Sequence, residues 1–406
     1  MKTLLPACLI SLASLSGAMD TWQLDFGTAE PTDGFLLVTA SERYHSARGY
    51  GYDLVGSPHD QGTVVTGTGG FYFSILAPPG NYLVSVQLGA PHFASDTTIK
   101  AESRRLMLDA IKVPAGESKT RSFVVNVRTP EIEPGDQVRL KDREKPYLHW
   151  DSKLTLEFNG QAPAIDSLEI RKAPEAQTIF LLGDSTVTDQ PYEPWNSWGQ
   201  MLPVFFDESV AVANHAESGE TIRSSLAAGR FRQVEHFLKP GDYVFLQFGH
   251  NDMKDRSPDA LDRYTTQLTQ AVTRFRAHGA HPVLVTSMER KSGVKADTLG
   301  RYPDAVRQVS ETTGAPLIDL HAMSRTLYQA LGSQLEAAFQ DGTHHNDYGS
   351  YLLAGCMAHG IQNELPELAQ HFRHGIEPID PAHPLLPADF HYPPSPLTDL
   401  AKPDGD

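Results

Sequence analysis

The chain has 406 residues, of which 40% are hydrophobic and 21% charged, and its formal net charge at pH 7 is -16. This length is comfortable for two domains. The negative charge, with no run of Lys or Arg to form a basic patch, argues against a nucleic-acid partner. After the first residues, no segment is long and apolar enough to span a membrane.

Residues 1–18 have the layout of a secretory signal peptide. A lysine is followed by an apolar core and by the small residues Ser16-Gly17-Ala18. The mature protein is therefore expected to be secreted or periplasmic. Removal of the signal leaves Cys356 as the single cysteine, so the mature chain has no internal disulfide. Cys356 lies in an apolar, helical-looking segment and is expected to be a buried structural thiol.

Residues 19–171 are predicted to form an all-β sandwich. Short apolar runs recur between turn signals such as Pro78-Pro79-Gly80-Asn81, and none of them alternates with a helix. Tyr44, Tyr50 and Tyr52 could stack on sugar rings, although strand and turn aromatics more often pack in the core. Strands are expected at 35–40, 71–76, 82–88, 97–102, 121–127, 153–158 and 166–171.

A polar connector at 171–176 separates this half from residues 177–373, where apolar strands alternate strictly with helices. That alternation predicts a parallel sheet covered on both faces, which is a three-layer α/β/α domain. Strands are expected at 178–183, 209–215, 242–249, 281–287 and 315–320, and helices near 195–206, 221–238, 258–278, 301–314, 321–333 and 347–363. The Pro-rich tail at 374–406 is expected to pack as an extended strap that frays near Lys402.

The most informative stretch is 177–190, QTIFLLGDSTVTDQ. Its apolar run stops at Gly183, so Ser185 lies just past the carboxyl end of a buried strand, where open α/β sheets place their chemistry. A serine at that point can be a nucleophile if the chain also supplies a base, an orienting acid and donors for an oxyanion. The alternative is an N-cap serine that opens the next helix.

Three further loops carry polar residues at the ends of predicted elements, at 214–220, 249–252 and 341–346. Parallel strands end on the same edge of a sheet, so the first two loops are expected to meet Ser185, and the last can fold back over it. Together the loops contain the parts that acyl transfer needs.

His344 can serve as the base, because histidine titrates near neutrality. Asp341, three residues earlier, can hold the histidine tautomer and stabilise the imidazolium. The backbone amides of Ser185 and Gly219 and the side-chain amide of Asn251 can donate to a tetrahedral oxyanion.

The sequence motifs GDS at 183–185, glycine at 219, GHND at 249–252 and DGTH at 341–344 occur in the order of the SGNH (GDSL) hydrolases, and the chain resembles that family from about 178 to 360. The strings GDSTVTD, WNSWGQ, QFGHND and DGTHHN are most similar to its rhamnogalacturonan acetylesterase branch. The resemblance implies a flavodoxin-like domain in which Ser185 is the nucleophile, His344 the general base and Asp341 the orienting acid. It also implies that Ser185, Gly219 and Asn251 form the oxyanion hole.

The β-rich half, with LDFG at 24–27 and GYGYDL at 49–54, is similar to the galactose-binding-like domain that precedes some of these esterases. One departure from the pattern follows Gly219. Glu220-Thr221 stands where the pectin-acting members tend to carry Arg-Ser, which weakens an inference about substrate.

Three residues are candidates for substrate contact. Trp195 and Trp198 could line a sugar cleft, although their helical spacing favours core packing for at least one of them. Arg223, just after the Gly219 loop, could meet a uronate or be an ordinary surface arginine.

His345 could join His344 and Asp341 as metal ligands, but no third neutral or thiolate ligand stands nearby, so neither a metal nor another cofactor is expected. His250 and Asp252 flank Asn251 and are expected to orient the loop rather than to react.

These observations favour an exported carbohydrate esterase that removes acetyl groups from a plant cell-wall polysaccharide. By resemblance, pectic rhamnogalacturonan is the first-choice substrate, and xylan is the nearest alternative. A lipase or thioesterase on the same scaffold is the next alternative. A glycan-binding protein with an inactive hydrolase half is the alternative from another class.

Overall fold

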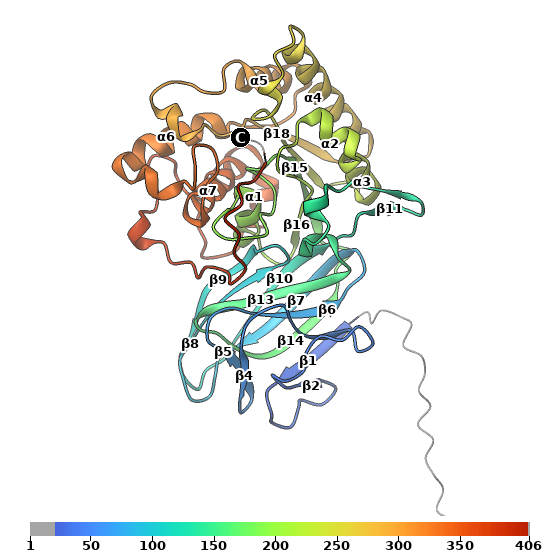
Figure 1. Ribbon diagram of the computed structural model, residues 1–406, viewed down its shortest axis with the longest axis vertical. Helices are drawn as coiled ribbons and strands as arrows, with labels where there is room; N and C mark the ends of the chain where they lie inside the picture. The colour runs from blue at the N-terminus through green and yellow to red at the C-terminus, as the bar shows by residue number, and fades with distance from the viewer. Residues whose placement is uncertain (1–20, 405–406) are drawn as a thin grey trace, which may run out of the picture.

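The structure is a computed structural model that describes residues 21–404, and it contains a β-sandwich packed against an α/β/α domain (Figure 1). The predicted signal peptide at 1–18 lies outside the described residues. None of the helices within 21–404 is both long and apolar enough to cross a membrane.

The first sheet of the sandwich pairs its strands antiparallel except for one parallel pair, β1 with β2. Every second residue of its central strands is buried, as expected for a sheet with one face on the core. Its order is β10 (Lys119–Val127), β7 (Gly80–Leu88), β14 (Ala164–Lys172), β1 (Thr21–Phe26) and β2 (Leu36–Val38), with β5 (Val64–Gly67) on β14 and β4 (Pro58–Gln61) on β5.

The second sheet is antiparallel throughout and packs its inner face against the first. Tyr52 is buried in the core between the sheets, and Tyr50 packs edge-on against Trp22, so these aromatics serve packing. The strand order is β3 (Tyr50–Asp53), β6 (Phe71–Leu76), β13 (Lys153–Ala162), β8 (Ser95–Ala101) and β9 (Arg105–Val113); a hairpin of β11 (Glu131–Glu133) and β12 (Asp136–Gln137) follows β10.

The second domain contains a five-stranded parallel sheet in the order β16 (Val210–Asn214), β15 (Gln177–Gly183), β17 (Tyr243–Gln247), β18 (His281–Val285) and β19 (Leu317–Ile318). Numbered along the domain, this is the 2-1-3-4-5 order of flavodoxin-like folds. The strand order reverses between β15 and β17, so the crevice at their carboxyl ends is the expected place for a ligand.

Helices cover both faces of this sheet, because the sheet is apolar on both. In β15, Ile179 and Leu181 face one hydrophobic cluster while Phe180 and Leu182 face the other. The first face carries α1 (Trp198–Met201), α6 (Leu320–Leu331) and α7 (Asp347–Glu364), and the second carries α2 (Ile222–Ala228), α3 (Arg230–Phe237), α4 (Ala260–Ala277) and α5 (Tyr302–Thr313), with α8 (Pro366–Ala369) after α7.

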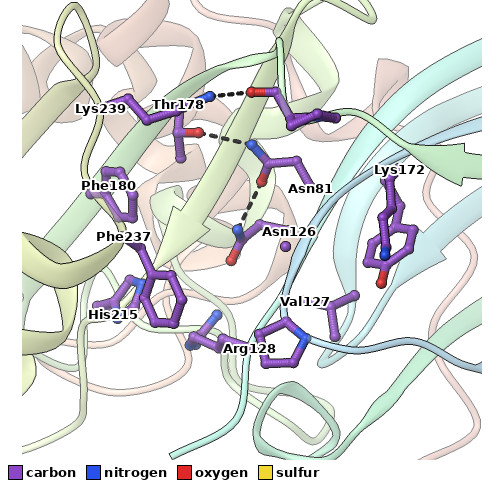
Figure 2. Close-up of a pocket in the computed structure, with 14 residues that line it drawn as sticks. Asn81, Asn126, Val127, Arg128, Lys172, Thr178, Phe180, His215, Phe237 and Lys239 are labelled. Carbon is purple, nitrogen blue, oxygen red and sulfur yellow. Dashed lines mark hydrogen bonds between the residues drawn. The ribbon is translucent and has the colours of Figure 1, made fainter. Parts of the chain in front are cut away.

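The two domains meet along a polar contact beside β15. The side-chain amide of Asn126 donates to Asn81 at 2.8 Å, and that of Asn81 donates to the Thr178 hydroxyl at 2.9 Å (Figure 2). A cavity of about 320 Å³, lined among others by Arg128 and His215, lies between the domains at this point. The hydrogen-bonded chain fixes the sandwich directly to β15, the strand that precedes Ser185.

The tail after α8 is an extended strap, as predicted, with a single helical turn, η7 (Pro387–Asp389). It contacts both domains: Tyr348 donates to the Leu385 carbonyl, and Lys100 donates to the Pro393 carbonyl at 2.7 Å. Near Lys402, where fraying is expected, the structure places the Lys402 ammonium 3.3 Å from the Asp341 carboxylate.

Candidate active site

Ser185 lies in a tight turn directly after β15. The Asp184 carboxylate accepts from the backbone and the hydroxyl of Thr186, and the Asp184 carbonyl accepts from the amides of Val187 and Thr188. Gly183 allows this turn, since a Cβ there would lie 2.6 Å from Val187 and 2.7 Å from the Gln247 carbonyl. The next α-helix begins at Trp198, so the N-cap interpretation of Ser185 is wrong.

The structure brings Ser185, His344 and Asp341 into one hydrogen-bonded chain. His344 Nε2 lies 2.9 Å from Ser185 Oγ, and His344 Nδ1 lies 2.9 Å from Asp341 Oδ2. Asp341 Oδ1 accepts from the backbone amides of Thr343 and His344 at 2.7 and 2.6 Å, which fixes the carboxylate in the loop before α7. Ser185 and His344 are both buried. This is the geometry in which a histidine can remove the serine proton.

The pKa of the Asp341 carboxyl is consistent with an ionised partner for the histidine. Burial alone would raise the pKa, but the hydrogen bond with His344 and the two backbone amides together lower it well below its ordinary value. Asp341 therefore remains a carboxylate across the neutral range, where it can hold a proton on His344 Nδ1.

Gly219 and Asn251 lie on loops that meet at the same sheet edge. The Glu217 amide donates to the Gly183 carbonyl, and Gln190 Nε2 joins the Ser185 carbonyl at 2.8 Å to the Ser218 hydroxyl at 3.4 Å. Gly219 itself has φ +78°, a left-handed conformation that favours glycine. Asn251 Nδ2 donates to the Glu220 carbonyl at 3.1 Å, which leaves its second hydrogen for another acceptor.

His250 sits beneath the Ser185 turn. Its ring nitrogens lie 2.9 Å from the Met288 carbonyl and 3.5 Å from the Asp184 carboxylate. The adjacent Asp252 accepts from the Ile222 amide at the start of α2. Both side chains therefore hold neighbouring loops together and lie outside the Ser185, His344 and Asp341 chain.

Asp252 should make stability depend on pH. Burial, with a contribution from Asp184, raises its pKa to about 7, whereas an unfolded aspartate has a pKa of about 3.9. The protonated form stabilises the fold, and that stability is lost as pH rises from about 4 to 7. Asp252→Asn keeps the acceptor for Ile222 and removes the ionisation. We expect wild type to lose about 1–3 kcal/mol of unfolding free energy relative to this variant between pH 5 and pH 8.

Urea unfolding of both proteins at the two pH values measures this difference. The exposed Asp262→Asn, on α4, is the control and should follow wild type. An equal difference between Asp252→Asn and wild type at both pH values would show that Asp252 is ionised throughout.

The two tryptophans have different environments. Trp195 is nearly buried, and its ring packs edge-on against His344 with centroids 5.8 Å apart. Trp198 is fully buried in the hydrophobic core and donates from its indole to Gln247 at 2.8 Å. Trp198 therefore has no surface to offer a sugar, and it is the tryptophan for which core packing is confirmed. Arg223 is exposed on α2. It is not among the residues that contact Ser185, His344 or Asp341 in the hydrogen bonds given above.

A hairpin of the sandwich supports the loop that carries Trp195. The sequence alone did not predict this contact between the domains. The turn between β8 and β9 places the Arg104 guanidinium, itself buried, 2.7 Å from the Trp195 carbonyl. The same group forms ion pairs with Glu193 and with Asp347 at the start of α7. Arg104 thus ties the loop over His344 to the helix that follows it, so the sandwich contributes directly to the site.

The histidine pair is not arranged as a metal site. Both ring nitrogens of His344 contact protein oxygens, and His345 Nε2 lies 2.9 Å from the Tyr328 hydroxyl. Burial lowers the pKa of His345 to about 3, so it stays neutral. His345 therefore contacts Tyr328, whereas His344 contacts Ser185.

Within residues 21–404, Glu289, Asp297 and His321 form one group whose spacing could suit a cation. Arg307 donates to His321 Nδ1 at 3.3 Å, which puts the ring proton on Nε2, facing Glu289 at 3.4 Å. A protonated nitrogen has no lone pair for a metal, so this group fits a salt-bridged cluster better than a metal centre.

The profile of the GDSL-like lipase/acylhydrolase family matches residues 181–352. Rhamnogalacturonan acetylesterase RhgT of Bacillus subtilis (strain 168) is 37% identical over 206 residues, which cover 45% of this chain and 89% of that protein. The chain therefore belongs to the GDSL-like lipase/acylhydrolase family and is an ester hydrolase.

Similarity to a further protein extends over both domains. Uncharacterized esterase YxiM of the same strain is 26% identical over 358 residues, which cover 82% of this chain and 88% of that protein. A solved structure of the B. subtilis YxiM protein covers 84% of this chain and 98% of its own length, with 23% identity and a TM-score of 0.46.

Proposed function

We propose that this chain removes acetyl groups from a plant cell-wall polysaccharide, with pectic rhamnogalacturonan as the first-choice substrate. The observation that carries the proposal is the hydrogen-bonded chain from Ser185 through His344 to Asp341, with 2.9 Å at each step. Relatives named as rhamnogalacturonan acetylesterases, in B. subtilis and in Emericella nidulans, support the choice of substrate.

In this proposal, Ser185 Oγ attacks the acetyl carbonyl carbon while its proton passes to His344 Nε2. The Asp341 carboxylate stabilises the resulting imidazolium. The amides of Ser185 and Gly219 and the side chain of Asn251 donate to the oxyanion. Collapse of the intermediate expels the sugar oxygen, which takes the proton from His344 and leaves the acetyl group on Ser185. A water molecule, deprotonated by His344, then releases acetate and restores the serine.

Release of the carboxylic acid, which is acetate from the acetylated polysaccharides and a fatty acid from a long-chain ester, tests the proposed activity and separates its alternatives. The panel contains acetylated rhamnogalacturonan, acetylated xylan, and a long-chain acyl ester for a lipase or thioesterase. We expect the highest kcat/KM on rhamnogalacturonan. A higher value on xylan would replace the substrate, a higher value on the long-chain ester would replace the reaction class, and no turnover of any ester would favour a glycan-binding protein.

We further propose that residues 1–18 direct export, because a plant polysaccharide is met outside the cell. N-terminal sequencing of the protein recovered from the producing cells would find the mature chain starting close to residue 19. A mature chain that retains Met1 would contradict this assignment.

Asn251 should act mainly in the transition state, because its free amide hydrogen serves the oxyanion rather than the ground-state carbonyl. Asn251→Ala is expected to lower kcat by about 10²–10³, or about 2.7–4 kcal/mol, with little change in KM. Asn251→Asp should be at least as harmful, because it adds negative charge where negative charge develops. Steady-state kinetics with a short-chain acetate ester measure both.

Thermal unfolding separates this role from a structural one, since Asn251 also donates to the Glu220 carbonyl. A variant that unfolds at a lower temperature but keeps full kcat while folded would remove Asn251 from the oxyanion hole.

A further inference from the structure

The chain's own C-terminal segment crosses the entrance to the site. The backbone around Leu397 pairs with Glu193: the Glu193 amide donates to the Leu397 carbonyl, and the Asp399 amide donates to the Glu193 carbonyl, both at 2.9 Å. From there residues 400–404 continue towards the carboxyl ends of the parallel strands, where Figure 1 shows the dark red segment ending between α1 and β18.

Residues 400–404 touch two parts of the proposed catalytic apparatus. The Lys402 ammonium lies 3.3 Å from Asp341 Oδ2, the oxygen that also faces His344. Asp404 packs against Gly219, since a Cβ added to Gly219 would lie 3.0 Å from Asp404 Cβ. A polysaccharide cannot approach Gly219 along this side while Asp404 is there.

The Asp404 carboxylate is held by a cation from the other domain. It forms an ion pair with Arg143 Nη1. Lys141 is also close, because its Nζ would lie 3.6 Å from a Cβ added to Gly219. Arg143 and Lys141 belong to the segment that links β12 to β13, around the helical turn η1 (Asp142–Glu144). The sandwich thus presents two cations beside an amide that is proposed to bind the oxyanion.

Residues on either side of Gly219 hold the side chains of Arg143 and Lys141 in place. Arg143 Nη2 donates to Glu217 at 2.6 Å and to the Ser218 carbonyl at 2.8 Å. Lys141 donates to the same carbonyl at 2.5 Å and lies 3.2 Å from Glu220. These contacts hold the two side chains in place and leave Arg143 Nη1 directed at Asp404. About a third of each cationic side chain remains exposed, so an external anion can reach them.

We propose that Arg143 and Lys141 form a binding site for a carboxylate of the substrate, which Asp404 occupies in this structure. The ligand class is an acidic sugar residue neighbouring the acetylated one. This inference rests on the proposed function. The substrate carboxylate replaces Asp404 at Arg143, and residues 400–404 move away, which also withdraws Lys402 from Asp341.

The displacement is inexpensive because the contacts to be broken are exposed. The Asp404 side chain is 60% exposed and that of Lys402 is 45% exposed, and exposed ion pairs contribute little to stability. Leu400 is itself 80% exposed. A cavity of about 290 Å³, lined by Tyr192, Trp195 and Arg143 and by residues of the segment, already adjoins this point. Release of the segment would enlarge it into a groove beside His344.

Competitive inhibition of 4-nitrophenyl acetate hydrolysis at low ionic strength tests the site. The probes are trigalacturonate and its neutral trigalacturonamide, which differ only in the charged groups. The measured quantity is the ratio of their inhibition constants, which does not depend on the turnover rate of a variant. The proteins are wild type, Asp404→Asn, and the double variant Lys141→Gln/Arg143→Gln. Lys145→Gln, an exposed lysine on the same segment, is the matched control.

We expect Asp404→Asn, in which the site is freed of its internal carboxylate, to bind the acid about fivefold more tightly than the amide. Wild type and Lys145→Gln should show a smaller preference, and the double variant should show none. Equal inhibition by acid and amide in Asp404→Asn, or a preserved preference in the double variant, would overturn the inference. Failure of Ser185→Ala to abolish turnover would instead overturn the proposed function, so the two failures are distinguishable.

Discussion

Ser185→Ala should abolish turnover and leave the fold intact. The variant loses one oxygen, whose partner is His344 Nε2 at 2.9 Å, while the Ser185 carbonyl keeps its hydrogen bond from Gln190. Loss of the nucleophile from a coupled set of catalytic residues can cost about 10⁶ in kcat. Initial rates of 4-nitrophenyl acetate hydrolysis, with the variant purified free of contaminating esterase, measure the loss.

The unfolding free energy provides the control for Ser185→Ala. Leaving His344 Nε2 without its buried partner costs about 1–3 kcal/mol, so the variant should still unfold cooperatively. Activity within tenfold of wild type, in protein of that purity, would contradict the assignment of the nucleophile.

Asp341→Asn should lower kcat by about 10⁴ while substrate still binds. The two backbone amides that bond Asp341 Oδ1 also fix the orientation of an asparagine, so its NH₂ group would face His344 Nδ1. The ring proton would then move to Nε2, and the nitrogen beside Ser185 could no longer accept a proton. Pre-steady-state kinetics with 4-nitrophenyl acetate should show the acetylation step slowed.

The two adjacent histidines supply the comparison for this prediction. His344→Ala should be as inactive as Ser185→Ala, whereas His345→Gln should stay within tenfold of wild type, since glutamine can also bond Tyr328. An inactive His345→Gln variant beside an active His344→Ala variant would place the base one residue later in the chain.

The order of elements in the α/β domain was predictable because each strand is a continuous apolar run that ends at a polar loop. The sequence placed Ser185 after β15 and Asn251 after β17, and the structure has both there. The carboxyl ends of parallel strands lie at the same edge of a sheet. The proximity of Ser185 and Asn251 was therefore predictable from the sequence pattern. The pairing of His344 with Asp341 likewise followed from their spacing of three residues.

Contacts between the domains were not predictable, because no local pattern marks them. Arg104 is buried beneath the Trp195 loop, although a charged residue in a turn is ordinarily exposed. The burial of Trp198 depends on which side of the short helix α1 faces the core. The return of residues 400–404 to the site, where Asp404 meets Arg143, joins segments more than 200 residues apart and could be seen only in three dimensions.

The most direct test of the proposed mechanism is covalent labelling with diethyl 4-nitrophenyl phosphate, which transfers a phosphoryl group to an activated serine. We expect one equivalent of nitrophenolate, complete loss of esterase activity, and the label on the peptide that contains Ser185, with labelling nearly absent in His344→Ala. Full labelling of another residue in the inactivated enzyme, or labelling of Ser185 in His344→Ala at the wild-type rate, would contradict the account.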